Sequence, residues 1–173
     1  MGERVIMNRK ILFKAKRKDW EELPKEEWWV EGYLFDDGMP EPKHYFIGGI
    51  IVKLYEGTAC DKWNVVGIDF CEIDINTICQ YTGLTGKYGK KIWENDILRG
   101  YQYPYRSDGN DNYFAEVTWF ENCPAFGIYT FKNPKSNVCG ISEGNTEFME
   151  NWNSEDWEVI GNIFDNTDLL EVE

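Results

Sequence analysis

The segment from Gln80 to Leu98 constrains the fold more than any other part of the chain. It reads QYTGLTGKYGKKIWENDIL, with apolar residues toward both ends and glycines and lysines between them. Glycine permits the positive φ angles of tight loops, and an aspartate side chain can bond backbone amides two residues further on. The pattern therefore predicts two short strands joined by a glycine-rich loop, then a tight turn at Glu94, Asn95 and Asp96 into a third strand.

Strand patterns dominate the rest of the chain, and helical patterns are short. The glycine pair Gly48-Gly49 predicts a bulge or bend within its strand. Pro24 interrupts one short helical pattern, and Asn166 is a candidate cap for a last turn. Many short strands with glycine between them favour a mainly β fold. The strands expected outside the first segment are 11–16, 28–35, 44–55, 63–75, 113–120, 127–132 and 157–164, and the helical turns are 19–27, 145–152 and 166–170.

The chain of 173 residues is long enough for one ordinary domain or two small ones. We expect a small SH3-like β-barrel in residues 79–173, because a turn like the one at 94–96 recurs in such barrels. An N-terminal β subdomain in residues 1–78 would pack with it. The alternative is one intertwined β domain.

Charge is unevenly spread along this acidic chain, whose formal net charge is −13. Residues 1–18 hold seven basic residues and one acidic residue, whereas residues 101–173 hold three basic and fourteen acidic residues. An acidic body repels phosphate, so nucleic-acid binding is disfavoured. We expect Lys14, Lys16 and Lys18 to face outward from an edge strand. Lysines on an edge strand protect it against unwanted pairing with other strands. Nucleic-acid binding through residues 4–18 is the remaining alternative.

The five cysteines are odd in number and form no C-x-x-C pair. The first residues lack the apolar core of a signal peptide, and no apolar run is long enough to span a membrane. We therefore expect a cytoplasmic protein with reduced thiols and no membrane partner.

No pattern of catalytic or metal-binding residues emerges from the sequence. Asp108, Asn110 and Asn112 begin like a calcium loop, but Tyr113 and Trp119 stand where an EF-hand needs glycine and glutamate. His44 is the one histidine, and no local signature pairs it with a cysteine. We therefore expect no metal, no cofactor and no enzymatic activity.

Two loops are candidate binding surfaces. The first follows the predicted third strand and carries alternating tyrosines, which are frequent interface anchors, and then an acidic tip. The second is the glycine-rich loop, where two lysines flank a tyrosine and would form a binding lip. The candidate partner-binding residues are Tyr101, Tyr103, Tyr105, Asp108 and Asp111 in the first loop, and Lys87, Tyr88 and Lys90 in the second.

Several motifs, in order along nearly the whole chain, resemble the YopX-like proteins of bacteriophages and prophages. Ile11-Leu12-Phe13-Lys14-Ala15 and Trp29-Val30-Glu31-Gly32-Tyr33 match two early motifs of that family. The central signature is matched by Gln80, Tyr81, Thr82, Gly83 and Leu84, then by Gly89, Lys90, Ile92, Trp93, Glu94, Asp96, Ile97 and Leu98. The terminal signature is matched by Val159, Ile160, Gly161, Asn162, Ile163 and Phe164, then by Asn166, Leu169 and Leu170.

Three departures from the family pattern lie in the central signature. Asn95 stands where the family usually has glycine, Trp93 stands where it has Tyr or Phe, and the loop before Gly89 begins with Thr85-Gly86. The resemblance implies a small, mostly β, phage-encoded protein of unestablished biochemical role. It carries over no catalytic residue. We expect the signature residues Gln80, Tyr81, Thr82, Gly83, Gly89, Glu94, Asp96, Gly161 and Asn162 to be mainly architectural.

Two functions remain open at this point. The first is a non-enzymatic module that binds a host or phage protein, with an acidic surface that mimics a nucleic acid. The second is a small ligand-binding or hydrolytic domain with its site between the two β units. A homo-oligomer is compatible with either function.

Overall fold

The computed structural model describes residues 10–41, 43–54, 63–101, 112–132, 146–148 and 156–170, and these residues are mainly β, as predicted. Within them the only helical segments are short 3-10 turns. The strands are β1 Phe13–Lys16, β2 Trp29–Asp36, β3 Tyr45–Leu54, β4 Trp63–Glu72, β5 Cys79–Thr85, β6 Lys91–Trp93, β7 Asp96–Tyr101, β8 Asn112–Phe120, β9 Ala125–Lys132, β10 Thr146–Phe148 and β11 Glu158–Asn162. The turns are η1 Trp20–Glu22, η2 Lys25–Glu27, η3 Ile75–Thr77, η4 Lys87–Gly89 and η6 Thr167–Leu169.

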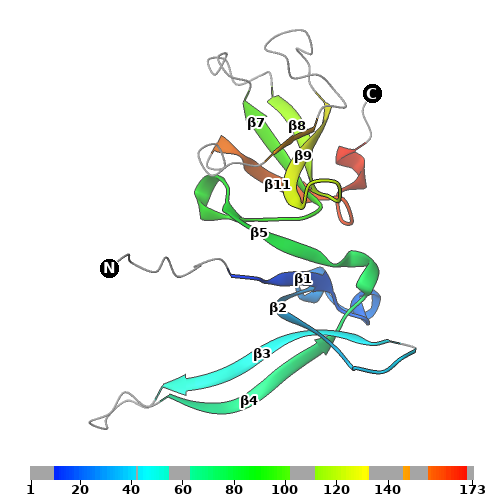
Figure 1. Cartoon of the computed structure of the whole chain (residues 1–173), viewed down its shortest axis with the longest axis vertical. Coiled ribbons are helices and arrows are strands. Elements are labelled where there is room, and N and C mark those ends of the chain that lie inside the picture. The colour runs from blue at the N-terminus through cyan, green and yellow to red at the C-terminus, as the bar shows by residue number, and fades with distance from the viewer. Residues whose placement is uncertain are drawn as a thin grey trace. The chain divides into compact units, whose positions relative to one another are not determined.

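Contacts divide the chain into two compact units, one of residues 10–80 and one that contains the described residues from Tyr81 onward. The boundary falls inside β5, whereas the boundary expected from the sequence falls just before it. Each unit has its own antiparallel pairing (Figure 1).

The first unit pairs its strands antiparallel in the order β4-β3-β2-β1, and β1 also pairs with the start of β5. Its core contains Ala15, Ile47 and Ile73, all buried. Side chains alternate between the faces of a strand, so one face of this sheet supplies Ile47 to the core. β3 and β4 form a long hairpin (Figure 1).

The expectation that β1 is an edge strand is wrong. β1 lies between β2 and β5, with Lys14 opposite both Glu31 and Cys79. Lys16 is only 3% exposed, and its backbone N–H donates to Oγ1 of Thr77 at 2.9 Å. The lysine pattern resembled an edge because the sequence does not show that residues near position 80 return to pair with β1.

Of the bulge or bend expected at Gly48-Gly49, the bulge is not found at these residues. The register of β3 on β4 is regular through both glycines, and it shifts between Ile51 and Val52. Gly48 has a different role, because a β-carbon there would overlap the carbonyl oxygen of Asp69 and the ring of Phe70. A glycine at this position lets β4 and its phenylalanine approach β3 closely.

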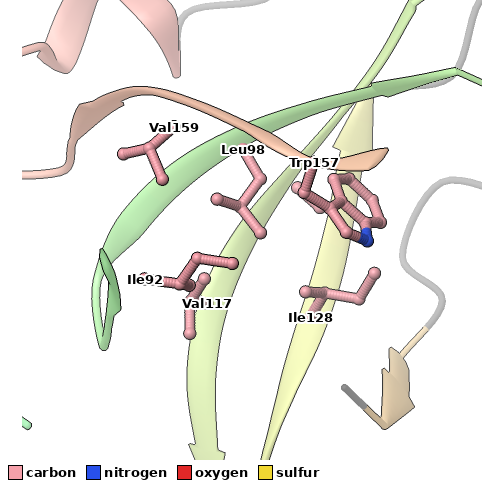
Figure 2. Packing of buried hydrophobic residues seen from close by; sticks show 7 residues of the cluster. Ile92, Leu98, Val117, Ile128, Trp157 and Val159 are labelled. Carbon is pink, nitrogen blue, oxygen red and sulfur yellow. The ribbon is translucent and has the colours of Figure 1, made fainter. Parts of the chain in front are cut away.

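The second unit contains a five-stranded antiparallel sheet in the order β10-β9-β8-β7-β11. One face of it supplies a buried core of Leu98, Ala115, Val117, Ile128 and Val159, together with Ile92 of β6 and Trp157 (Figure 2). Gly100 permits this packing, since a β-carbon there would lie 2.7 Å from the Trp157 ring. The strands expected at 113–120 and 127–132 are present as β8 and β9, which pair antiparallel.

The segment 80–98 folds as predicted: β5, the glycine loop with η4, β6, a two-residue turn and β7. Residues 19–27 form the two short turns η1 and η2 on either side of Pro24. The expected helical turn at 145–152 is wrong at its start, because residues 146–148 form β10 against β9. Among the described residues, no helix is long and apolar enough to cross a membrane.

Candidate partner-binding lip

The glycine-rich loop between β5 and β6 is held in place by backbone hydrogen bonds. Gly86 N–H donates to the Lys90 carbonyl at 2.7 Å, which closes the loop on itself. Lys87 N–H donates to the carbonyl of Trp157 at 2.6 Å, which fixes the loop to the residue before β11. A β-carbon at Gly86 would lie 2.7 Å from that carbonyl oxygen, so the close approach requires glycine.

Tyr88 lies at the tip of this loop in an unusual backbone conformation. Its φ is +64°, and the φ of the next residue, Gly89, is +71°. Glycine adopts such angles without steric cost, whereas a bulky residue at positive φ is strained by about 1–2 kcal/mol. The strained residue is a large aromatic one, and its side chain does not compensate by burial, because Tyr88 is 84% exposed.

Two lysines flank the tyrosine, and we call Lys87, Tyr88 and Lys90 the lip. Nζ of Lys87 lies 5.3 Å from the centroid of the Tyr88 ring, and Nζ of Lys90 donates to the Val159 carbonyl at 3.3 Å. The lip therefore presents an exposed ring with the Lys87 ammonium group beside it, on a backbone that hydrogen bonds hold in place. Such a surface can bury the ring against a partner.

The structure places these three predicted binding residues on one loop. Tyr101 ends β7, and its side chain is not described. Tyr103, Tyr105, Asp108 and Asp111 lie outside the described residues.

The first signature residues beside the lip make contacts within the fold. Gln80 pairs with Phe13 of β1, and the ring centroids of Tyr81 and Trp93 lie 5.3 Å apart. Thr82 is buried; its Oγ1 donates to the carbonyl of Ile92 at 2.8 Å and accepts from Leu84 N–H at 3.1 Å. Gly83 has a φ of +90°.

The turn between β6 and β7 is built around Asp96, which is 2% exposed. Its Oδ2 accepts the Trp93 N–H at 2.8 Å, while Glu94 occupies the half-buried first turn position. Asn95 N–H donates to the carbonyl of Val117 at 2.8 Å, and its own carbonyl accepts Ile163 N–H at 3.1 Å. The turn therefore ties β8 and the end of β11 to β7.

The terminal signature forms a second hydrogen-bonded turn. Oδ1 of Asn162 accepts the N–H groups of Phe164 and Asp165, both at 2.9 Å. The N–H of Asn162 donates to Oδ1 of Asn166 at 3.2 Å. Asn166 was expected to cap the last turn, but its side chain makes no cap hydrogen bond with η6. A β-carbon on Gly161 would overlap that Asn166 amide, which accounts for glycine there.

The sequence model of the YopX protein family matches residues 50–171, well over half of the chain. The chain belongs to the YopX family. A comparison with curated proteins found no match. Among solved structures, the crystal structure of protein EF1440 from Enterococcus faecalis is similar, with 18% identity and a TM-score of 0.44, over 94% of this chain and 99% of that one.

One departure from the family pattern has a direct structural explanation. Asn95 replaces the usual glycine of YopX proteins, and its φ is +64°. Asparagine is several-fold enriched among non-glycine residues at such angles. Asn95 therefore holds a positive φ angle that glycine would also adopt.

Among the described residues of this YopX chain, no three His, Cys, Asp or Glu side chains are grouped so that they could hold a metal ion. Nδ1 of His44 lies 2.8 Å from Oε1 of Glu72, as expected for a satisfied surface histidine. Burial raises the pKa of the Cys71 thiol, an effect that the nearby Arg17 guanidinium partly offsets. A thiol of raised pKa is a poor nucleophile at neutral pH.

Proposed function

We propose that this YopX protein is a non-enzymatic interaction module of phage or prophage origin, which binds a host or phage protein in the bacterial cytoplasm through the lip. It needs no metal or cofactor for this. The observation that carries the proposal is Tyr88: its side chain is 84% exposed on a backbone at φ +64°.

Strain at an exposed residue favours a binding role over a structural one. Burial of an aromatic ring in the core can offset the free-energy cost of backbone strain, but the Tyr88 ring is mostly exposed and gains little from burial. Glycine would relieve the strain, and glycine already stands at two other positions of the loop, Gly86 and Gly89. A tyrosine retained at this cost is understandable if its ring is buried only when a partner is bound.

Charge supports the finer form of the proposal, in which acidic surface imitates a nucleic acid and competes for a basic protein surface. The net charge is −13. The segment that contains η1 and η2 exposes four glutamates, Glu21, Glu22, Glu26 and Glu27. Attraction between exposed charges weakens as salt rises, so the complex is expected to be sensitive to salt.

The test is a pull-down of the tagged chain from bacterial lysate, with nuclease present, at about 0.05 M and about 0.5 M salt. Bound proteins are identified by mass spectrometry. We expect one host protein retained at low salt and lost at high salt. Tyr88→Gly should abolish retention, whereas the control Tyr129→Ala, which removes another exposed tyrosine on β9, should not.

Three outcomes contradict parts of the proposal. Retention that Tyr88→Gly leaves unchanged excludes the lip as the binding site. Retention that is equal at both salt concentrations excludes the acidic, nucleic-acid-like form. No retained protein at either concentration contradicts the interaction module itself and favours the small ligand-binding or hydrolytic domain.

A further inference from the structure

One face of the first unit's sheet is apolar and exposed. Side chains that are opposite each other in register share a face. Tyr33, Gly48 and Phe70 form one such row across β2, β3 and β4, and Ile50 and Ile68 form another across β3 and β4. Phe35 shares a third row with Phe46 and Glu72. We call Tyr33, Phe35, Ile50, Ile68 and Phe70 the apolar face.

The exposure of this face is unusual for a sheet with one core side. Each of the five side chains is between 43% and 64% exposed, while Ile47 on the opposite face is buried in the core. Antiparallel sheets with one solvated face usually carry polar residues there. Large contiguous apolar patches on soluble proteins usually mark interaction sites.

Two of the five residues, Phe35 and Phe70, pack against each other. The rings of Phe35 and Phe70 meet edge to face, with centroids 4.9 Å apart. The Phe70 ring also covers Gly48, where a β-carbon would overlap it. The face is therefore a packed surface on three paired strands, which lowers the entropic cost of binding a partner.

The exposed area is sufficient for an interface between two copies. A fully exposed large apolar side chain presents roughly 200 Å², so these five leave on the order of 500 Å² accessible. Two such faces packed together would bury about 1,000 Å², which reaches the size expected of a biological interface. Surrounding residues would add to this area.

The charges around the face suit a second copy of the same chain. No member of the apolar face is charged, although the whole chain has a net charge of −13. At its margins, two acidic side chains have a neighbour within one copy: Lys14 lies opposite Glu31 in register, and Nδ1 of His44 lies 2.8 Å from Oε1 of Glu72. Neither of these two carboxylates would therefore enter the interface without a polar neighbour from its own copy.

We propose that the apolar face packs against the apolar face of a second copy to form a two-fold symmetric dimer. Two sheets that pack face to face lie about 10 Å apart, with strand directions within about 30°. Homodimer interfaces are more apolar than transient ones, and this face meets that description. The proposal does not depend on the lip, which belongs to the other unit.

The experiment is sedimentation velocity on the full chain under reducing conditions, from about 1 to 100 µM protein, at about 0.05 M and 0.5 M salt. Reducing agent excludes dimers linked through the exposed thiol of Cys123. We expect a species of twice the 20.4 kDa chain mass. The fraction of this species at high salt should equal or exceed the fraction at low salt. This is the opposite of the salt response expected for the partner complex, so the two proposals fail separately.

Substitutions locate the interface. Ile50→Lys and Ile68→Lys should each weaken the dimer at least tenfold, and Tyr129→Lys, a matched change on a strand of the other unit, should leave it unchanged. Far-UV circular dichroism confirms that each variant is folded. A monomeric wild-type chain at 100 µM overturns the proposal. A dimer that survives Ile50→Lys also overturns it, since Ile50 lies on the inner strand β3, which a copy paired along the edge of β4 would not cover.

Discussion

Nζ of Lys16 lies 3.9 Å from the centroid of the Trp20 ring, inside the first unit. Trp28 and Trp29 also face this ammonium group, at 4.6 Å and 5.8 Å. The rings of Trp20 and Trp28 meet edge to face, with centroids 4.8 Å apart. A lysine of β1 thus occupies an aromatic cage built from η1, the end of η2 and the start of β2.

The cage predicts an energetic coupling between Lys16 and Trp20. A cation over a ring contributes from about 0.5 kcal/mol when exposed to about 2 kcal/mol when desolvated. A double-mutant cycle with Lys16→Met and Trp20→Leu should therefore give a coupling of about 1–2 kcal/mol in urea unfolding. Lys14→Met is the control, because Nζ of Lys14 lies over Trp29 instead. An equal coupling between Lys14 and Trp20 would contradict the cage.

Gly161 and Asn166 predict a second coupling, in the terminal signature. Gly161→Ala should destabilise the chain by roughly 1–3 kcal/mol, because its β-carbon would overlap the Asn166 amide. Asn166→Ala removes that amide, so the double variant should lose less stability than the two single variants together. Gly49→Ala is the matched control, since a β-carbon there meets open space. Strict additivity in thermal unfolding would exclude the steric explanation.

We expect the Tyr88 ring to contribute to binding but not to the stability of the fold. Tyr88→Gly relieves the positive φ angle, while glycine adds entropy to the unfolded chain, so stability should be unchanged or rise by up to about 1 kcal/mol. Tyr88→Val, β-branched at the same angle, should lose about 1 kcal/mol. Urea unfolding measures both. A clear loss of stability in Tyr88→Gly would show that the ring supports the fold.

Glu116 predicts a dependence on pH. Burial raises the pKa of this carboxyl group on β8, so the folded chain holds its proton at pH values where the unfolded chain has lost it. The contribution of Glu116 to the free energy of unfolding is therefore fully present below the pKa that the group has in the unfolded chain. It is lost as the pH rises through the pKa that the group has in the folded chain. Glu116→Gln should match the wild type near pH 4 and exceed its stability near pH 8 in urea unfolding. Glu121→Gln, at an exposed site, is the matched control.

Local pattern was sufficient for most of the secondary structure in the described residues. The run from Gln80 to Leu98 predicted two strands, a glycine loop and a turn, because each of these depends on residues close in sequence. The same local pattern places Lys87, Tyr88 and Lys90 in this glycine loop, and their role in binding stays a prediction. Residues 146–148 were predicted as a helical turn, because only pairing with β9 makes this short segment a strand.

The sequence by itself determined that the chain is mainly β, where most of its strands lie and which family it resembles. The tertiary structure decided which of these strands are central and which faces are covered. β1 is an inner strand and Lys16 is a buried residue, because both interact with residues more than sixty positions away in the sequence. Tyr33, Ile50 and Phe70 remained exposed, although their residue types favour burial. Alternation along a strand shows that its two faces differ, but only long-range packing decides which face the core covers.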